Sequence, residues 1–251
     1  VFIMSITFLI TAIISGPDLK LIFKGLLIPS INNNNILVVI GIIGTTVVPY
    51  NLFLHSYIVN EKWGGKKDLK NATFDTIISV IIGGIISMSI IITSGSSKII
   101  GNNIEINNAM DLGTQLQPFL GLYSKYLISI GLFAAGISSS LTAPLATSYA
   151  LSGIFNYEAN LSNKYFKFVA IVIILTGLLF SSLNYKPIMI IKFAQIINGI
   201  FLPFIAIFLF WAINRPNILG SYVNSRSYNF LGIFIIGITI ILGVKSIISV
   251  I

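Results

Sequence analysis

The stretch that decides the fold is Gly44-Thr-Thr-Val-Val-Pro-Tyr-Asn-Leu-Phe-Leu-His-Ser56, a polar interruption in an otherwise apolar helix. Its proline removes one helical hydrogen bond and clashes with the preceding turn. Carbonyl groups freed in this way need a new partner inside a membrane, because lipid offers no donor. The interruption also holds His55, the single histidine of the chain. A broken membrane helix with hydroxyl, amide and imidazole groups beside the break is a candidate ion site.

The composition assigns the chain to a membrane. Its 251 residues are 55% hydrophobic and only 9% charged, and the mean hydropathy is +0.96, whereas a soluble domain carries about 25% charged residues. The absence of cysteine excludes disulfides and thiolate metal sites, and a single histidine excludes a multi-histidine zinc site. The net charge of +8 comes from basic residues in short loops. The positive-inside rule explains them better than nucleic-acid binding does.

The apolar runs predict an all-α polytopic membrane protein with a single transmembrane domain over residues 1–251. The first run, Val1 to Ser15, is too short to span a bilayer and stops before Gly16-Pro17, so we expect a truncated helix whose start is missing. Six further spans bring the expected number to seven. They cover residues 36–60 (broken at Pro49), 73–94, 120–150, 165–183, 187–213 and 228–251.

Two connecting segments have their own patterns. Residues 16–35 form an amphipathic connector that ends in an asparagine run. Residues 95–119 are predicted to be a long loop, in which 107–117 is expected to form a short surface helix capped by Asn107 or Asn108.

The orientation follows from lysine and arginine in alternate loops. The loops after the second, fourth and sixth spans hold Lys62, Lys66, Lys67, Lys70, Lys164, Lys167, Arg215 and Arg226. The opposite loops hold Lys20, Lys24, Lys98 and Lys186. The first set is predicted to face the cytoplasm, which puts His55 toward the cytoplasmic end of its span.

The polar interruption resembles the sixth transmembrane helix of the NRAMP family of divalent-metal transporters. The family pattern is an alanine, two residues, Met-Pro-His-Asn, three residues, and His-Ser. The matching positions here are Thr45, Val48, Pro49, Tyr50, Asn51, His55 and Ser56. Other stretches are similar to the family in the same order and spacing, namely Gly131 to Leu145, Phe193 to Pro203, and Asn214 through Gly220 to Asn224.

This resemblance implies a LeuT-like fold of two inverted five-helix repeats, with the metal held between two broken helices. The chain would cover helix five, in part, through helix eleven. The family's Asp-Pro-Gly-Asn ligand motif lies in the first repeat, which is not in this sequence. The missing N-terminal helices would therefore be needed to complete the site.

Two residues at the break carry the implied metal chemistry. Thr45 matches the alanine whose carbonyl faces the metal, and the alternative is a hydroxyl bonded to the carbonyl four residues earlier. Val48 replaces the family methionine, whose thioether favours transition metals over Mg²⁺ and Ca²⁺. In one alternative the site has only hard ligands and therefore discriminates less well against Mg²⁺. In the other, its remaining oxygen ligands suffice to bind Mn²⁺. These two alternatives stay open.

The residues after the proline also match positions of the family pattern. Tyr50 replaces the first family histidine and is expected to be a packed ring, because tyrosine, with an unperturbed pKa of about 10, is a poor proton carrier at neutral pH. Asn51 is expected to satisfy backbone groups at the break or to cap the second half-helix. His55 matches the second family histidine, and we assign it to a proton pathway. The alternative for His55 is a neutral ring bonded between helices.

Gln195 matches a glutamine that reaches the metal in some family states, and Asn198 lies one turn later on the same face. Gln195 is predicted to be a transient ligand and Asn198 to line the cavity. The alternative for both amides is hydrogen bonding between helices.

The sequence therefore predicts a secondary transporter in a multi-pass integral membrane protein, with a bacterial plasma membrane as the expected location. Transport would use alternating access, with Mn²⁺ or Fe²⁺ as the first candidate substrates and proton symport as an option. The alternatives are an NRAMP-related Mg²⁺ transporter without proton coupling and an amino-acid carrier on the same fold. No cofactor other than the transported ion and no nucleic-acid partner are expected, and no nucleophile–base set indicates an enzyme.

Overall fold

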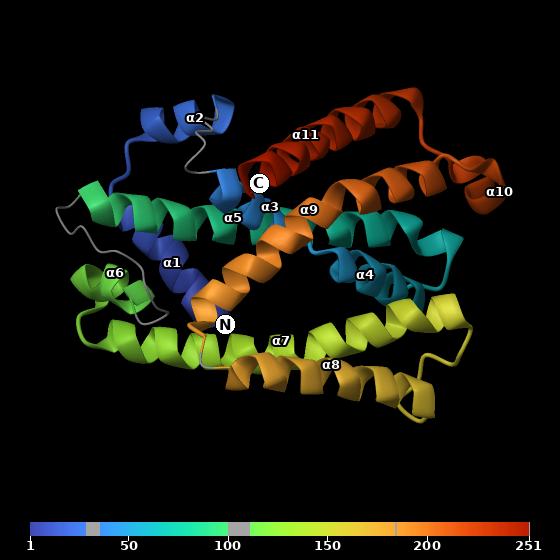
Figure 1. The fold of residues 1–251 in the computed structure, drawn as a ribbon. Helices are drawn as coiled ribbons and strands as arrows, with labels where there is room; N and C mark the ends of the chain where they lie inside the picture. The colour runs from blue at the N-terminus through green and yellow to red at the C-terminus, as the bar shows by residue number, and fades with distance from the viewer. Residues whose placement is uncertain (29–35, 100–110, 184, 251) are drawn as a thin grey trace. The chain divides into compact units, whose positions relative to one another are not determined.

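The computed structural model describes residues 1–28, 36–99, 111–183 and 185–250. Over these ranges the chain forms helices and no strand (Figure 1), so the predicted all-α class is confirmed. The α-helices are α1 (Phe2–Ile14), α2 (Leu19–Leu27), α3 (Ile36–Thr46), α4 (Pro49–Lys62), α5 (Leu69–Ile99), α6 (Asp111–Leu120), α7 (Tyr123–Phe155), α8 (Lys164–Ser182), α9 (Pro187–Ile213), α10 (Pro216–Leu219) and α11 (Arg226–Val250). Two short 3₁₀ helices are η1 (Lys66–Asp68) and η2 (Gly220–Tyr222).

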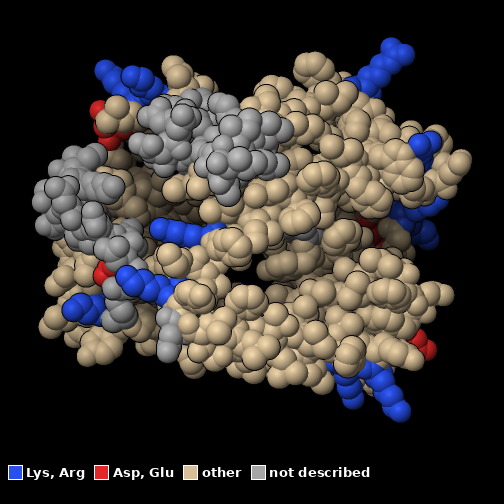
Figure 2. Space-filling model, viewed as in Figure 1, with Lys and Arg blue, Asp and Glu red and all other residues tan. Residues whose placement is uncertain are grey.

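Five helical segments within the described ranges are long and apolar enough to cross a bilayer. They are Leu37–Lys62, Lys66–Ser96, Tyr123–Phe155, Lys164–Ser182 and Pro187–Ile213. The first combines α3 and α4, as the prediction of one broken span requires. The pair α1 and α2 passes the same test only as a span bent by 113°, and the apolar part of α11 is shorter. Uncharged side chains cover most of the face seen in Figure 2, as expected where helices face lipid.

The predicted loop over 95–119 is wrong at its start, where helix α5 continues to Ile99, whereas the short helix predicted over 107–117 corresponds in part to α6. Helix α6 packs on α7 with the side chains of Gln115 and Leu116 buried. Polar residues are accommodated in these helices because they bond to one another: the Ser94 hydroxyl donates to Gln115 Oε1 at 2.9 Å. Helix α6 is therefore not a surface helix. The predicted caps Asn107 and Asn108 lie outside the described residues.

The amphipathic connector contains α2, which begins where the sequence offers a cap. The Asp18 carboxylate accepts hydrogen bonds from the backbone N–H of Lys20 at 2.8 Å and of Leu21 at 3.4 Å. These bonds satisfy two of the N–H groups that a helix start leaves without partners.

The chain divides into two compact units, and each is described by itself. Unit 1 comprises Val1–Pro29 and Leu54–Ile188. Within it α1 packs on α5, and α7 packs on both α6 and α8. Its core is formed by Phe8, Leu116 and Ile128, which are almost fully buried. Helix α7 approaches α1 closely at Gly131, where the Met4 side chain fills the space that a Cβ would take.

A second cluster in unit 1 joins α4 to α7 and α8. The rings of Tyr57 and Tyr149 stack at 3.9 Å between centroids, and Tyr149 meets Phe166 edge-on at 5.0 Å. In the loop after α7, the Tyr157 hydroxyl donates to the Ser148 carbonyl at 3.1 Å. Burial raises the pKa of Tyr157 above its ordinary value of 10.0, so this hydroxyl keeps its hydrogen at physiological pH.

Unit 2 comprises Ser30–Phe53 and Met189–Ile251. In it α3 packs on α11, and Ile40 of α3 is almost fully buried. The first half of the broken span, the break itself and the start of α4 all belong to this unit.

Candidate functional site

The helix break lies at Val47 and Val48, between the end of α3 at Thr46 and the start of α4 at Pro49. The sequence predicted a break at Pro49, Tyr50 and Asn51, which are all helical. The difference has a physical reason. Proline is tolerated in the first turn of a helix, where its missing N–H has no helical acceptor to lose, and it disfavours helical backbone in the residue before it. The proline therefore begins the second half-helix.

The break leaves three consecutive carbonyl groups without backbone donors. The Val47 N–H bonds to the Ile43 carbonyl at 3.0 Å, and the next such bond along the chain joins the Asn51 N–H to the Val48 carbonyl at 3.0 Å. Proline has no N–H to offer the Thr45 carbonyl four residues earlier. In this described segment the carbonyls of Gly44, Thr45 and Thr46 accept no backbone hydrogen bond. They are hard oxygen donors of the kind that bind divalent cations.

The two threonines at the end of α3 behave differently. The Thr46 hydroxyl donates to the carbonyls of Ile42 at 2.7 Å and Ile43 at 3.0 Å. Back-bonding to an earlier carbonyl was the alternative considered for Thr45, but Thr46 is the residue that does it. The exposed Thr45 hydroxyl has no hydrogen-bond partner among the described residues.

Helix α9 crosses α3 directly at this turn, because both helices have a glycine at the crossing. A Cβ on Gly44 would collide with the Gln195 carbonyl oxygen and lie 2.6 Å from the Gly199 nitrogen. A Cβ on Gly199 would lie 2.7 Å from the Ile40 carbonyl oxygen. Glycine lets membrane helices approach this closely. The crossing sets the Gln195 backbone against the residue that precedes Thr45.

The two amides predicted to share a face of α9 are in contact. Asn198 Nδ2 donates to Gln195 Oε1 at 3.1 Å, and both side chains are half-buried. The Gln195 amide oxygen accepts this bond with one lone pair, and its second lone pair remains available to a cation. Gln195 and Thr45 are therefore near the same helix crossing, whereas the sequence alone places them 150 residues apart.

The other residues of the motif have simpler surroundings. Val48 is only 7% exposed, and its side chain offers no ligand atom. Tyr50 is half-buried, as a packed ring would be. Asn51 lies inside the first turn of α4, so Val48 and not Asn51 occupies the N-cap position. The physical reason is the start of α4 at Pro49, which moves the helix end upstream of the asparagine.

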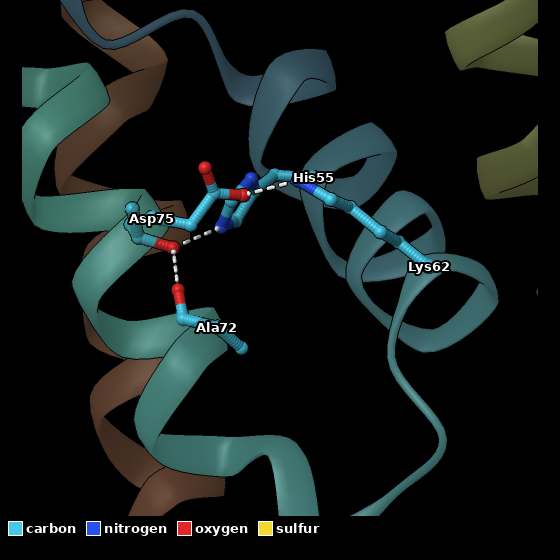
Figure 3. A network of polar contacts seen from close by, with 5 residues as sticks. His55, Lys62, Ala72 and Asp75 are labelled. Atoms are coloured by element: carbon cyan, nitrogen blue, oxygen red, sulfur yellow. Dashed lines mark hydrogen bonds and ion pairs between the residues drawn. The ribbon is translucent and has the colours of Figure 1, made fainter.

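His55 contacts α5 (Figure 3). Its Nε2 lies 3.2 Å from the Thr76 hydroxyl oxygen, and this hydroxyl lies 2.8 Å from the Ala72 carbonyl oxygen. Two turns further along α4, Lys62 forms an ion pair with Asp75 at 2.7 Å, and both side chains are about half exposed. Asp75, near the start of α5, therefore has a lysine partner on α4.

Within the described ranges, no three His, Asp or Glu side chains come together as a metal-binding group. The oxygen-bearing groups on the residues at or next to the α3–α9 crossing are main-chain carbonyls, the Thr45 hydroxyl and the side-chain amides of Gln195 and Asn198.

A family comparison decides the identity of the chain. The model of the natural resistance-associated macrophage protein-like (NRAMP) family matches residues 1–249. The chain belongs to the NRAMP family. The resemblance drawn from the broken helix is thereby confirmed, as is the assignment to integral membrane proteins.

Bacterial relatives are similar over most of this NRAMP chain. A divalent metal cation transporter MntH of Clostridium acetobutylicum is 27% identical over 223 residues, which is 86% of this chain and 50% of the relative. The Bacillus subtilis protein of the same name is 26% identical over 235 residues, covering 90% and 53%. The Staphylococcus saprophyticus protein is 27% identical over 270 residues, covering 99% and 60%. The chain thus spans about half the length of the curated relatives it matches.

Sequence reasoning missed two features of this NRAMP site. Gly44 and Gly199 were part of the quoted motifs, but nothing in either motif indicates that they face each other. Thr76 was not singled out, since a threonine beside a charged residue is unremarkable. A glycine inside each of two polar-interrupted spans was the available signal for the crossing.

Proposed function

We propose that this chain forms the second half of a secondary transporter for divalent metal cations, in which the broken span supplies carbonyl ligands. The observation that carries the proposal is the set of three donor-free carbonyls at Gly44, Thr45 and Thr46. These carbonyls begin at Gly44, where α9 crosses α3, and this position supports Gln195 as a further oxygen ligand. The printed names of the bacterial relatives agree with a divalent cation as substrate.

The roles of the site residues follow from this proposal. Pro49 keeps the Thr45 carbonyl free, because no N–H can occupy it. The Thr45 carbonyl and the Gln195 amide oxygen bind the ion, and Asn198 orients the amide. His55 belongs to a proton pathway on the second half-helix. The carboxylate ligand comes from outside this chain.

Alternating access through a single transmembrane domain is part of the same proposal, and the resemblance to LeuT-like carriers supports it. An amino-acid carrier would instead use a half-helix N-terminus for the substrate carboxylate. Here the groups left free at the break are acceptors, which favours a cation.

The test is uptake of Mn²⁺ in proteoliposomes by the full-length protein that contains this chain and the helices proposed to complete the site, with and without a large excess of Mg²⁺. We expect saturable Mn²⁺ uptake, since carbonyl and carboxylate oxygens suit Mn²⁺ well. Liposomes without protein are the control. Absence of uptake for Mn²⁺, Fe²⁺ and Mg²⁺ alike would overturn the proposal, and uptake driven by an amino acid would replace it.

Mg²⁺ is a second candidate substrate because Val48 is buried at the break and offers no sulfur ligand. We expect excess Mg²⁺ to inhibit Mn²⁺ uptake and Val48→Met to reduce this inhibition, because a thioether favours the softer ion. Val48→Ile is the matched control, since it adds bulk without sulfur. An unchanged Mn²⁺-over-Mg²⁺ preference in Val48→Met would remove the role assigned to this position.

A further inference from the structure

A hydroxyl on α5 is shared between a histidine and a carbonyl. The Thr76 Oγ1 atom lies 2.8 Å from the Ala72 carbonyl oxygen, four residues earlier in the same helix, and 3.2 Å from His55 Nε2 on α4. Figure 3 shows the ring of His55 directed toward α5 and the dashed line from the hydroxyl to Ala72.

A threonine hydroxyl has a single hydrogen to donate. Threonines in membrane helices commonly give it to the carbonyl four residues earlier. Thr73, one residue after Ala72, does so with Leu69 at 2.8 Å. Thr76 has the same geometry toward Ala72, so its oxygen presents only lone pairs to the imidazole. A hydrogen bond between Thr76 and the ring then requires the hydrogen to be on Nε2.

We propose that Thr76 is a positioning residue that fixes His55 in the Nε2–H tautomer and leaves Nδ1 as the ring atom that takes up and releases a proton. The imidazolium form also carries a hydrogen on Nε2. The bond to Thr76 therefore survives protonation, and the contact between α4 and α5 is the same in both charge states. With the opposite tautomer, the hydroxyl would donate to Nε2, and protonation of the ring would require this hydroxyl to rotate toward the Ala72 carbonyl and reverse the direction of the bond.

The neighbouring charges are compatible with this assignment. Asp75, next to Thr76 in the chain, is bound by Lys62 at 2.7 Å. Lys62 Nζ donates to Asp75 Oδ2. The hydroxyl of the following residue, Thr76, is the partner of the His55 ring. The functional meaning of the tautomer rests on the proposed proton pathway, but its existence can be measured without any transport.

The test is the nitrogen NMR spectrum of the protein with isotope-labelled histidine, recorded above the pH at which the ring titrates. Comparison with a His55→Gln sample assigns the signal to this ring. We expect the Nε2–H form to exceed the Nδ1–H form by about tenfold, which is what one hydrogen bond of ordinary strength supports. Thr76→Ser should keep this ratio, and Thr76→Val should lower it toward that of free histidine in the same buffer.

Thr73→Val is the matched control, because it removes a back-bonded hydroxyl from the same helix without touching the ring. A predominant Nδ1–H form in the unmodified protein would overturn the proposal. So would a tautomer ratio in Thr76→Val equal to that of Thr76→Ser. A protein that shows the expected tautomer but transports no metal would leave this inference standing and would contradict only the proposed function.

Discussion

Two glycines decide where α9 passes α3, and through this contact they decide which side chains surround the break. Gly44 and Gly199 each face backbone atoms of the opposite helix, so neither position has room for a methyl group. Gly41, one turn earlier on α3, is different. A Cβ there would meet only Ile196 Cγ1, at an ordinary 3.8 Å.

These surroundings predict opposite outcomes for two alanine substitutions on one helix. Gly44→Ala should destabilise the protein by at least about 1–3 kcal/mol, the usual cost of overpacking, because the methyl group meets main-chain atoms that cannot rotate away. Gly41→Ala should be neutral or stabilise by up to about 1 kcal/mol through helix propensity. Thermal unfolding in detergent, followed by Mn²⁺ uptake, measures both. Equal stability of the two variants would contradict the close crossing.

Individual residues of the site could be predicted only where a local pattern reveals them. Pro49 was identifiable because a proline within a helical run frees a backbone carbonyl whatever the rest of the fold does, and Thr45 was predicted from the family resemblance. The contact between Gln195 and Gly44 could not be predicted, since no periodicity links two residues so far apart in the chain. The Gln115 amide partner of Ser94 and the Thr76 hydroxyl partner of His55 could not be predicted for the same reason.

At the scale of helical elements, the broken span consists of two half-helices with only Val47 and Val48 outside the helical pattern. The break depends on a single missing N–H group. Restoring this group should close the gap, since every other residue from Ile36 to Lys62 is already helical.

Pro49→Ala should therefore leave stability equal or higher and reduce metal uptake by tenfold or more. The new N–H can bond to the Thr45 carbonyl and occupy the proposed ligand, and one added hydrogen bond contributes about 0.5–1.5 kcal/mol to stability. Pro216→Ala, at the first position of α10, is the control and should leave uptake unchanged. Normal uptake by Pro49→Ala would show that this carbonyl is not a ligand.

Most helices were predictable as elements, because a span of about 20 apolar residues is recognisable in isolation. The residues at which these helices begin and end were less predictable. Helix α5 extends beyond its apolar run because its serines and threonines bond to carbonyls within the helix or to α6. The second half-helix starts earlier than predicted because proline prefers the first helical turn.

For the whole molecule, the distribution of basic residues predicts how the chain is oriented in the membrane. The loop between α7 and α8 should face the cytoplasm, and the loop between α8 and α9 the opposite side. The chain contains no cysteine, which makes single introduced thiols informative.

Ser162→Cys should react with a membrane-impermeant maleimide only after cells are permeabilised, whereas Tyr185→Cys should react in intact cells. Both positions are exposed. The unsubstituted protein gives the background labelling. The reverse pattern would invert the topology and would place His55 toward the outside.

The division into two units has a mechanical consequence for the broken span. The boundary falls between Phe53 and Leu54, so α3 is anchored by α9 and α11, while the far part of α4 is anchored by Thr76 and Tyr149. Val47 and Val48 are the two residues of the span that lie outside both half-helices. We expect the span to bend most easily there, and such a bend would change the direction of the carbonyl groups that precede it. The geometry of the proposed ligands would then depend on the bend angle of a single span.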